Sequence, residues 1–134
     1  MMQLKIISWN INGVHTKLEK DNVQRVLSIY DIICLNEVKT SLNVSFPGYI
    51  AYKSISKEAP HRGGTVVLIK SYLRPLIIRV DVSICDQVWI EIKSAPVVLF
   101  GFCYVPPSDS MYYSHEYFGS IQAKLKNNPF HSYL

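Results

Sequence analysis

The sequence contains no run of about 18 consecutive apolar residues, the length that a membrane-spanning helix needs. Its first apolar stretch is also too short for a secretory signal and lacks a small-residue cleavage site. We therefore expect no membrane association and an intracellular location, nuclear or cytoplasmic. Internal repeats, low-complexity tracts and linkers are absent as well, which predicts one domain over residues 1–134.

Cysteine is scarce, and its pattern excludes two kinds of structural cross-link. The three cysteines are Cys34, Cys85 and Cys103, and each lies in an apolar stretch. An odd number at wide spacing argues against a disulfide framework and against a zinc site. The pattern predicts three reduced thiols in the core.

Charge is present at a modest level and with a modest imbalance. Lys and Arg together number 14, against 10 Asp and Glu. This excess favours an anionic partner without identifying it. Apolar residues make up 49% of the 134-residue chain, enough for a sizeable core, which argues against intrinsic disorder.

Hydrophobic periodicity predicts the order of the secondary-structure elements. Short apolar runs bounded by turn residues indicate strands, and apolar side chains three or four positions apart indicate helices. We expect strands at residues 4–9, 31–35, 49–53, 65–69, 76–82, 88–92 and 97–104, and helices at 17–30 and 111–125. This order predicts an α+β fold with a mixed β-sheet covered by helices.

Polar residues stand where three of these strands end. Asn10 follows the first strand, Glu37 follows the second, and Tyr104 closes the last. Strand ends often meet at one rim of a layered fold, where a carboxylate can hold Mg²⁺ and an amide or phenol can contact a phosphate. Each residue also has an ordinary interpretation: a turn former, a solvated carboxylate and an aromatic at the edge of the core.

Five segments in order resemble the endonuclease/exonuclease/phosphatase superfamily. Residues 7–14 (ISWNINGV), 33–40 (ICLNEVKT) and 101–106 (GFCYVP) resemble three successive motifs of that superfamily. Residues 46–54 (FPGYIAYKS) and 62–70 (RGGTVVLIK) further resemble the endonuclease domains that accompany reverse transcriptases in non-LTR retroelements. The resemblance covers essentially the whole chain.

The resemblance implies a fold, a reaction and a set of site residues. The fold would be part of a four-layer α/β/β/α sandwich, and the reaction would be metal-dependent cleavage of phosphoester bonds with Mg²⁺ or Mn²⁺. Carried over by motif, Glu37 would be the metal ligand, Asn10 would lie beside the metal and the scissile phosphate, and Tyr104 would orient that phosphate. Lys39, two residues after the glutamate, would support the same site.

A basic turn adds one more candidate for substrate binding. His61 and Arg62 precede Gly63 and Gly64. Such a loop can touch a phosphate backbone. It can equally be a solvated hairpin loop.

The departures from the family pattern limit what this chain is expected to do. Asn36 stands where the family usually has Gln, and the family's later Gly-Asp-x-Asn motif and final Asp-His pair have no counterpart before Leu134. We therefore expect the N-terminal half of a DNA endonuclease domain, truncated and inactive or weakly active alone. The alternatives are a catalytically silent nucleic-acid-binding module, a non-functional gene fragment, or a phosphatase of the same superfamily. The oligomeric state is left open.

Overall fold

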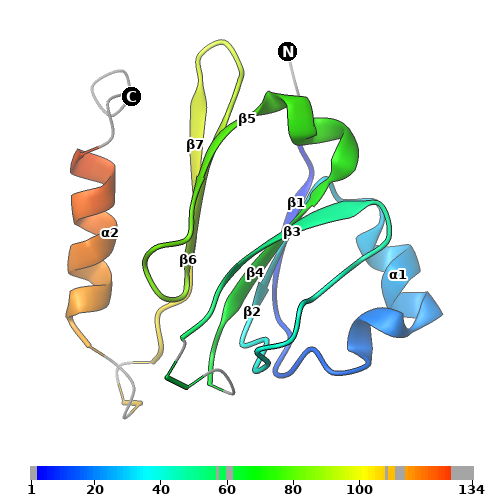
Figure 1. The fold of residues 1–134 in the computed structure, drawn as a ribbon, viewed down its shortest axis with the longest axis horizontal. Coiled ribbons are helices and arrows are strands. Elements are labelled where there is room, and N and C mark those ends of the chain that lie inside the picture. Colours follow the sequence, from blue (N-terminus) through cyan, green and yellow to red (C-terminus); the bar gives the residue numbers. More distant parts are fainter. Residues whose placement is uncertain (1–2, 57, 60–61, 108, 111–113, 128–134) are drawn as a thin grey trace.

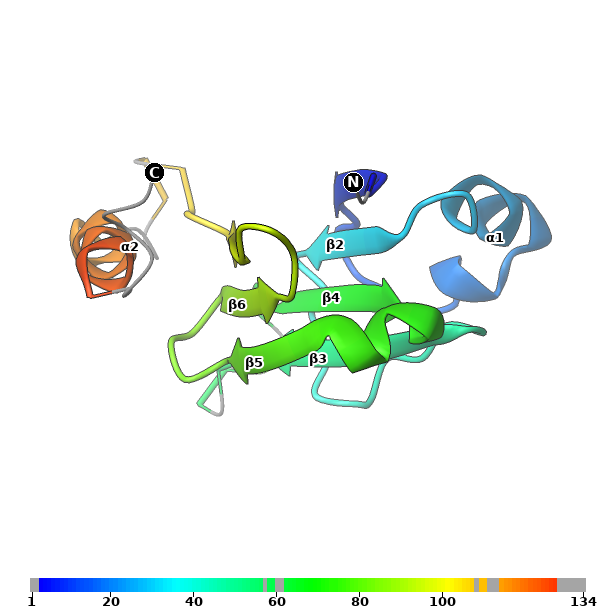
Figure 2. The same cartoon turned by 90° about the horizontal axis from the view of Figure 1, so that it is seen from above.

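The computed structural model of the chain describes residues 3–56, 58–59, 62–107, 109–110 and 114–127. Two β-sheets face each other, and a helix lies outside each sheet (Figure 1). Seen from above, the two helices lie at opposite ends of the molecule (Figure 2). The four layers follow the α/β/β/α order that the family resemblance implied, and the class is α+β as the residue patterns predicted.

The first sheet is mixed and has the strand order β1-β2-β4-β3. Its strands β1 and β2 are parallel, and the other pairs are antiparallel. The two central strands are apolar over nearly their whole length because both of their faces are covered. The strands are β1 (Ile6–Asn10), β2 (Ile32–Asn36), β3 (Tyr49–Ser54) and β4 (Thr65–Lys70).

The second sheet is antiparallel, in the order β5-β6-β7. The residue patterns alone predicted a single mixed sheet. They do not indicate how the strands divide between two sheets. The strands are β5 (Ile77–Asp81), β6 (Gln87–Ile92) and β7 (Val98–Cys103).

The space between the sheets is filled by aliphatic side chains. Val67 and Ile69 of β4 and Ile90 and Ile92 of β6 are fully buried in one cluster. A second cluster lies between the first sheet and its helix, where Leu27 packs among residues of β2 and β4. Burial of this apolar surface is the main driving force that holds the layers together.

The helix outside the second sheet is α2 (Glu116–Lys126). Gln87 of β6 donates a hydrogen bond of 2.8 Å to Ser120 of the helix, and Lys124 forms an ion pair with Asp81 of β5. Trp89, also on β6, is buried, with 4% of its surface exposed. The helix starts later than the predicted residue 111, and residues 111–113 lie outside the described residues.

The predicted helix at residues 17–30 is broken into two. A 3₁₀ helix, η1 (Lys17–Glu19), precedes the short helix α1 (Asp21–Leu27). Lys20 between them is extended, with ψ of 131°, which no helical residue adopts. A further 3₁₀ helix, η2 (Ser71–Leu76), joins β4 to β5 and was not predicted.

The cysteine prediction was wrong for one of the three residues. Cys34 is buried and Cys103 is partly buried, but Cys85 is exposed in the turn before β6. All three thiols are free. Within the described part of the chain, no helix has the length and apolar character needed to cross a membrane.

Candidate functional site

Glu37 follows the last residue of β2 in an unusual backbone conformation. Its φ is +55°, in the left-handed region that residues with a Cβ rarely occupy. Its carbonyl accepts a hydrogen bond of 2.7 Å from the backbone of Gly13, and Val38 and Lys39 donate to Gly64 and Gly63. Strained conformations of this kind persist where the surroundings determine them, and they cluster at functional sites.

Tyr104 comes directly after β7, in the other sheet. Its hydroxyl donates a hydrogen bond of 2.7 Å to Oε1 of Glu37. Its backbone N–H donates to the carbonyl of Asp86 over 3.0 Å. The two residues predicted from separate strand ends therefore meet across the two sheets.

The environment of Tyr104 keeps its hydroxyl protonated. Burial, and next the hydrogen bond and negative charge of Glu37, raise the pKa of Tyr104 to about 12. Both effects disfavour the phenolate. At neutral pH the hydroxyl can thus donate a hydrogen bond to an anionic oxygen.

A cavity of about 660 Å³ opens beside this pair. Glu37 and Tyr104 line it together with Lys39 and Arg62, so the two predicted substrate contacts lie at the same cavity. His61, the other member of the basic turn, lies outside the described residues. The remaining wall is a mixture of acidic, small and aromatic side chains: Ser56, Glu58, Ala59, Gly63, Cys85, Asp86, Pro106, Pro107, Ser110 and Tyr117.

Asn10 lies at the neighbouring strand end, not on the cavity wall. The parallel pairing places it opposite Asn36, the residue before Glu37. Its side-chain oxygen accepts a hydrogen bond of 3.2 Å from the backbone of Asn12. This is the turn-forming role that the sequence alone would assign to an asparagine.

Lys39 joins this turn to the segment of Glu37. Its Nζ donates a hydrogen bond of 2.5 Å to Oδ1 of Asn12. Asn12 and Lys39 both have positive φ, 47° and 55°. The loops after β1 and β2 are therefore fastened to each other beside the cavity.

Comparison with known proteins identifies the family of this chain. The model of the endonuclease/exonuclease/phosphatase family matches residues 7–128. The chain belongs to that family. No curated protein matches the sequence.

Solved structures share the fold of this family member. The catalytic domain of APE2 from Xenopus laevis matches with a TM-score of 0.69 at 20% identity, over 92% of this chain and 53% of that one. The AP endonuclease LMAP from Leishmania major matches with 0.64 at 15%, over 92% and 45%. An AP endonuclease from Archaeoglobus fulgidus matches with 0.53 at 22%, over 92% and 49%. The chain spans about half the length of these structures.

The residues of this site could supply part of the ligand set of one divalent cation. Among the described residues, no three His, Cys, Asp or Glu side chains gather as a metal cluster. Proteins often bind Mg²⁺ through one or two carboxylates, with water and substrate phosphate as the other ligands. Glu37 offers such a carboxylate at the cavity, with one oxygen engaged by Tyr104.

Asp86, which was not predicted from the sequence, lies on the same cavity wall. Its side chain is buried, with 6% exposed, and Oδ1 accepts a hydrogen bond of 2.8 Å from the backbone of Gly64. Burial raises the pKa of this carboxyl, although the bonds from Gly64 and Cys85 oppose the shift. The only signal in the sequence was an acidic residue directly before an apolar strand, which is a common turn pattern.

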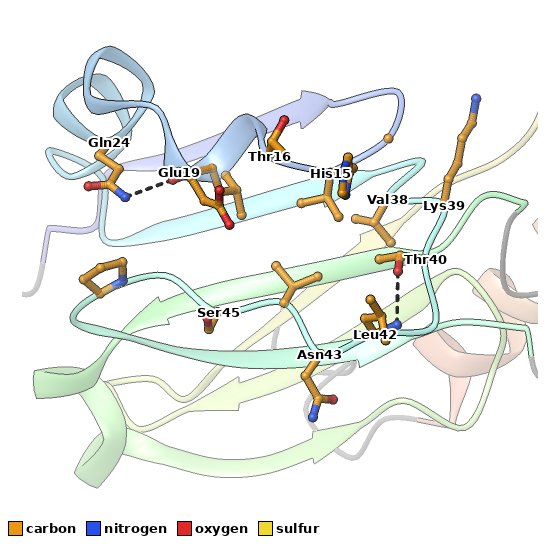
Figure 3. Close-up of a pocket in the computed structure, with 15 residues that line it drawn as sticks. His15, Thr16, Glu19, Gln24, Val38, Lys39, Thr40, Leu42, Asn43 and Ser45 are labelled. Atoms are coloured by element: carbon orange, nitrogen blue, oxygen red, sulfur yellow. Dashed lines mark hydrogen bonds between the residues drawn. The ribbon is translucent and has the colours of Figure 1, made fainter.

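A second cavity, of about 560 Å³, lies between the loop after β1 and the loop after β2 (Figure 3). Its wall includes His15, Glu19 and Asn43, and of the predicted site residues only Lys39 contributes. The Lys39 side chain points away from the other labelled residues. We therefore place the candidate site in the cavity of Glu37 and Tyr104.

Proposed function

We propose that this chain is the N-terminal portion of a Mg²⁺- or Mn²⁺-dependent phosphodiesterase that cleaves DNA. The observation that carries the proposal is the hydrogen bond between Tyr104 and Glu37 at a cavity that Lys39 and Arg62 also line. Membership of the family and the likeness to AP endonucleases support DNA as the partner.

Each residue has a role that its chemistry allows. Glu37 holds the metal ion, which when bound neutralises charge on the phosphate. Tyr104 can turn its one hydroxyl hydrogen bond from Glu37 to a phosphate oxygen, and Lys39 and Arg62 attract the DNA backbone. Asn10 fixes the loop that adjoins Glu37 and offers its amide to the phosphate or to a water molecule.

The origin and the level of activity are further parts of the proposal. Residues 46–54 and 62–70 support descent from a retroelement endonuclease. We expect slow or no hydrolysis by the 134-residue chain, because the chain spans about half of the enzymes that it matches. A lone carboxylate supplies only a small part of the transition-state stabilisation that the reaction needs.

A silent binding module is the second candidate function. The net charge of +4 and the position of Lys39 and Arg62 at the cavity favour it, because both attract a polyanion without any need for catalysis. Under this alternative, binding to short duplex DNA depends on salt while no nicking occurs at any metal concentration.

A plasmid-nicking assay with Mg²⁺ tests the first candidate. It compares this chain, any longer natural form of it, and the Glu37→Ala variant of each. We expect nicking chiefly in the longer form and its loss in Glu37→Ala. Nicking that survives Glu37→Ala would contradict the proposal, and cleavage of phosphomonoesters without nicking would favour a phosphatase.

A further inference from the structure

Asp86 has the contacts of a residue that organises a site. It stands directly before β6 with φ of +61°, a conformation that Asp and Asn tolerate better than most residues. A carboxylate with 6% exposure is costly to bury unless hydrogen bonds compensate. Asp86 accepts hydrogen bonds from the backbone of Gly64, the hydroxyl of Thr65 and the backbone of Tyr104.

The carboxylate holds the Gly63–Gly64 turn. Oδ1 accepts the hydrogen bond from Gly64, and a Cβ on Gly63 would lie 3.4 Å from both carboxylate oxygens. The carbonyls of this turn accept hydrogen bonds from Lys39 and Val38, over 2.9 and 3.2 Å. The turn therefore fixes the two residues that follow Glu37.

The main chain of Asp86 holds the other half of the pair. Its carbonyl accepts a hydrogen bond from the N–H of Tyr104 over 3.0 Å, and another from the hydroxyl of Thr65 over 3.4 Å. The single hydrogen of this hydroxyl is shared with the side-chain oxygen of Asn36, the residue before Glu37, at 3.1 Å. Asp86 thus contacts both the turn that holds the residues after Glu37 and the backbone of Tyr104.

We propose that Asp86 is a positioning residue that fixes Glu37 and Tyr104 relative to each other. The role of Glu37 and Tyr104 as the functional site rests on the proposed function. The positioning of these two residues by Asp86 rests on the geometry alone. The ordinary alternative is a carboxylate that stabilises its own turn and has no effect on the pair.

Two substitutions separate these cases. Asp86→Gly removes the carboxylate and tolerates the positive φ, whereas Asp86→Asn keeps an oxygen acceptor for Gly64 and removes only the charge. The readout is the ¹³Cζ resonance of Tyr104 in the tyrosine-labelled chain at neutral pH, assigned with Tyr104→Phe. Glu37→Gln gives the shift expected when the acceptor of the Tyr104 hydroxyl is weakened.

Tyr117 serves as an internal control for charge. The negative charge of Asp86 contributes to the raised pKa of both Tyr104 and Tyr117, so loss of the charge affects both residues in both variants. Loss of positioning is expected to shift only the Tyr104 resonance, and only in Asp86→Gly.

The expected result is a Tyr104 shift in Asp86→Gly that exceeds the Tyr104 shift in Asp86→Asn by at least half the Glu37→Gln shift and in the same direction, while Tyr117 shifts equally in the two variants. A Tyr104 resonance that stays in place in folded Asp86→Gly overturns the proposal, as does an equal shift in both variants. If Asp86→Gly does not fold, Asp86→Ala, which also removes the acceptor of the Gly64 hydrogen bond, is compared with Asp86→Asn in the same way. No metal or DNA is present, so failure here leaves the proposed function standing.

Discussion

Tyr104 and Glu37 are 67 positions apart in the sequence, and the hydroxyl of Tyr104 donates a hydrogen bond of 2.7 Å to the carboxylate of Glu37. Glu37 follows β2 of the first sheet, and Tyr104 follows β7 of the second. The bond therefore joins the two sheets at the rim where the cavity opens. Changes to this pair are expected to affect both the site and the stability of the fold.

Tyr104→Phe should weaken the fold slightly at neutral pH and alter its response to alkali. Loss of one half-buried hydrogen bond costs about 1 kcal/mol. The folded pKa of Tyr104, about 12, is above the unfolded value. The stability from the protonated hydroxyl is therefore fully present below about pH 10 and is lost as the pH rises toward 12.

Urea denaturation at several pH values measures this dependence. We expect the free energy of unfolding to fall less steeply between about pH 10 and 12 in Tyr104→Phe than in the unsubstituted chain. Parallel curves would show that the hydroxyl of Tyr104 does not titrate as its contacts indicate.

Gly101→Ala should destabilise the second sheet. A Cβ at this position would lie 2.5 to 2.8 Å from three ring atoms of buried Trp89, so the ring or the strand must shift, which costs about 1–3 kcal/mol. Gly119→Ala is the matched control. Nothing lies within 4 Å of its added Cβ, and alanine favours the helix by about 0.5–1 kcal/mol. Tryptophan fluorescence in urea should show opposite shifts of the two midpoints.

Gly64→Ala should cost more stability than Gly48→Ala. Both glycines have positive φ, +91° and +82°, so both substitutions introduce backbone strain. Only at Gly64 would the Cβ also meet a neighbour, Cγ2 of Val38 at 2.8 Å. We expect an additional loss of about 1 kcal/mol or more in chemical denaturation. Equal losses would mean that the contact between the turn and Val38 relaxes freely.

The strands were predictable because their signal is local. The run of apolar residues in β2 and the similar run in β4 indicate strands covered on both faces, and both are central strands of the first sheet. The two sheets became predictable only through the family resemblance, since hydrophobic periodicity does not state which strands pair.

Features that depend on distant contacts were not predictable. Lys20 interrupts a helical pattern that is continuous in the sequence, and Asp86 reads as an ordinary turn residue. Its significance comes from hydrogen bonds to Gly64 and Tyr104, which are 22 and 18 positions away and belong to different sheets or loops. The Glu37–Tyr104 pair was anticipated as two separate strand ends, and its direct contact was visible only in three dimensions.

Lys39→Gln should reduce the affinity for duplex DNA and the dependence of that affinity on salt. If Lys39 contacts a phosphate, its loss lowers the slope of log affinity against log salt concentration by about 1. Lys53→Gln is the control. It removes the same charge from β3, away from the cavity, where Lys53 donates to Asn43 over 2.9 Å. Fluorescence anisotropy with a labelled duplex at several salt concentrations measures both slopes; equal slopes would place the DNA elsewhere.

The most direct test of the site is the location of a bound divalent ion in this chain. Mn²⁺ added at low ratio broadens the NMR signals of nearby amides even when binding is weak. The account predicts that broadening centres on Glu37, the loop after β1 and Tyr104, and that Glu37→Gln removes it. Broadening centred elsewhere, or unchanged in Glu37→Gln, would contradict the claim that Glu37 and Tyr104 form the metal and phosphate site.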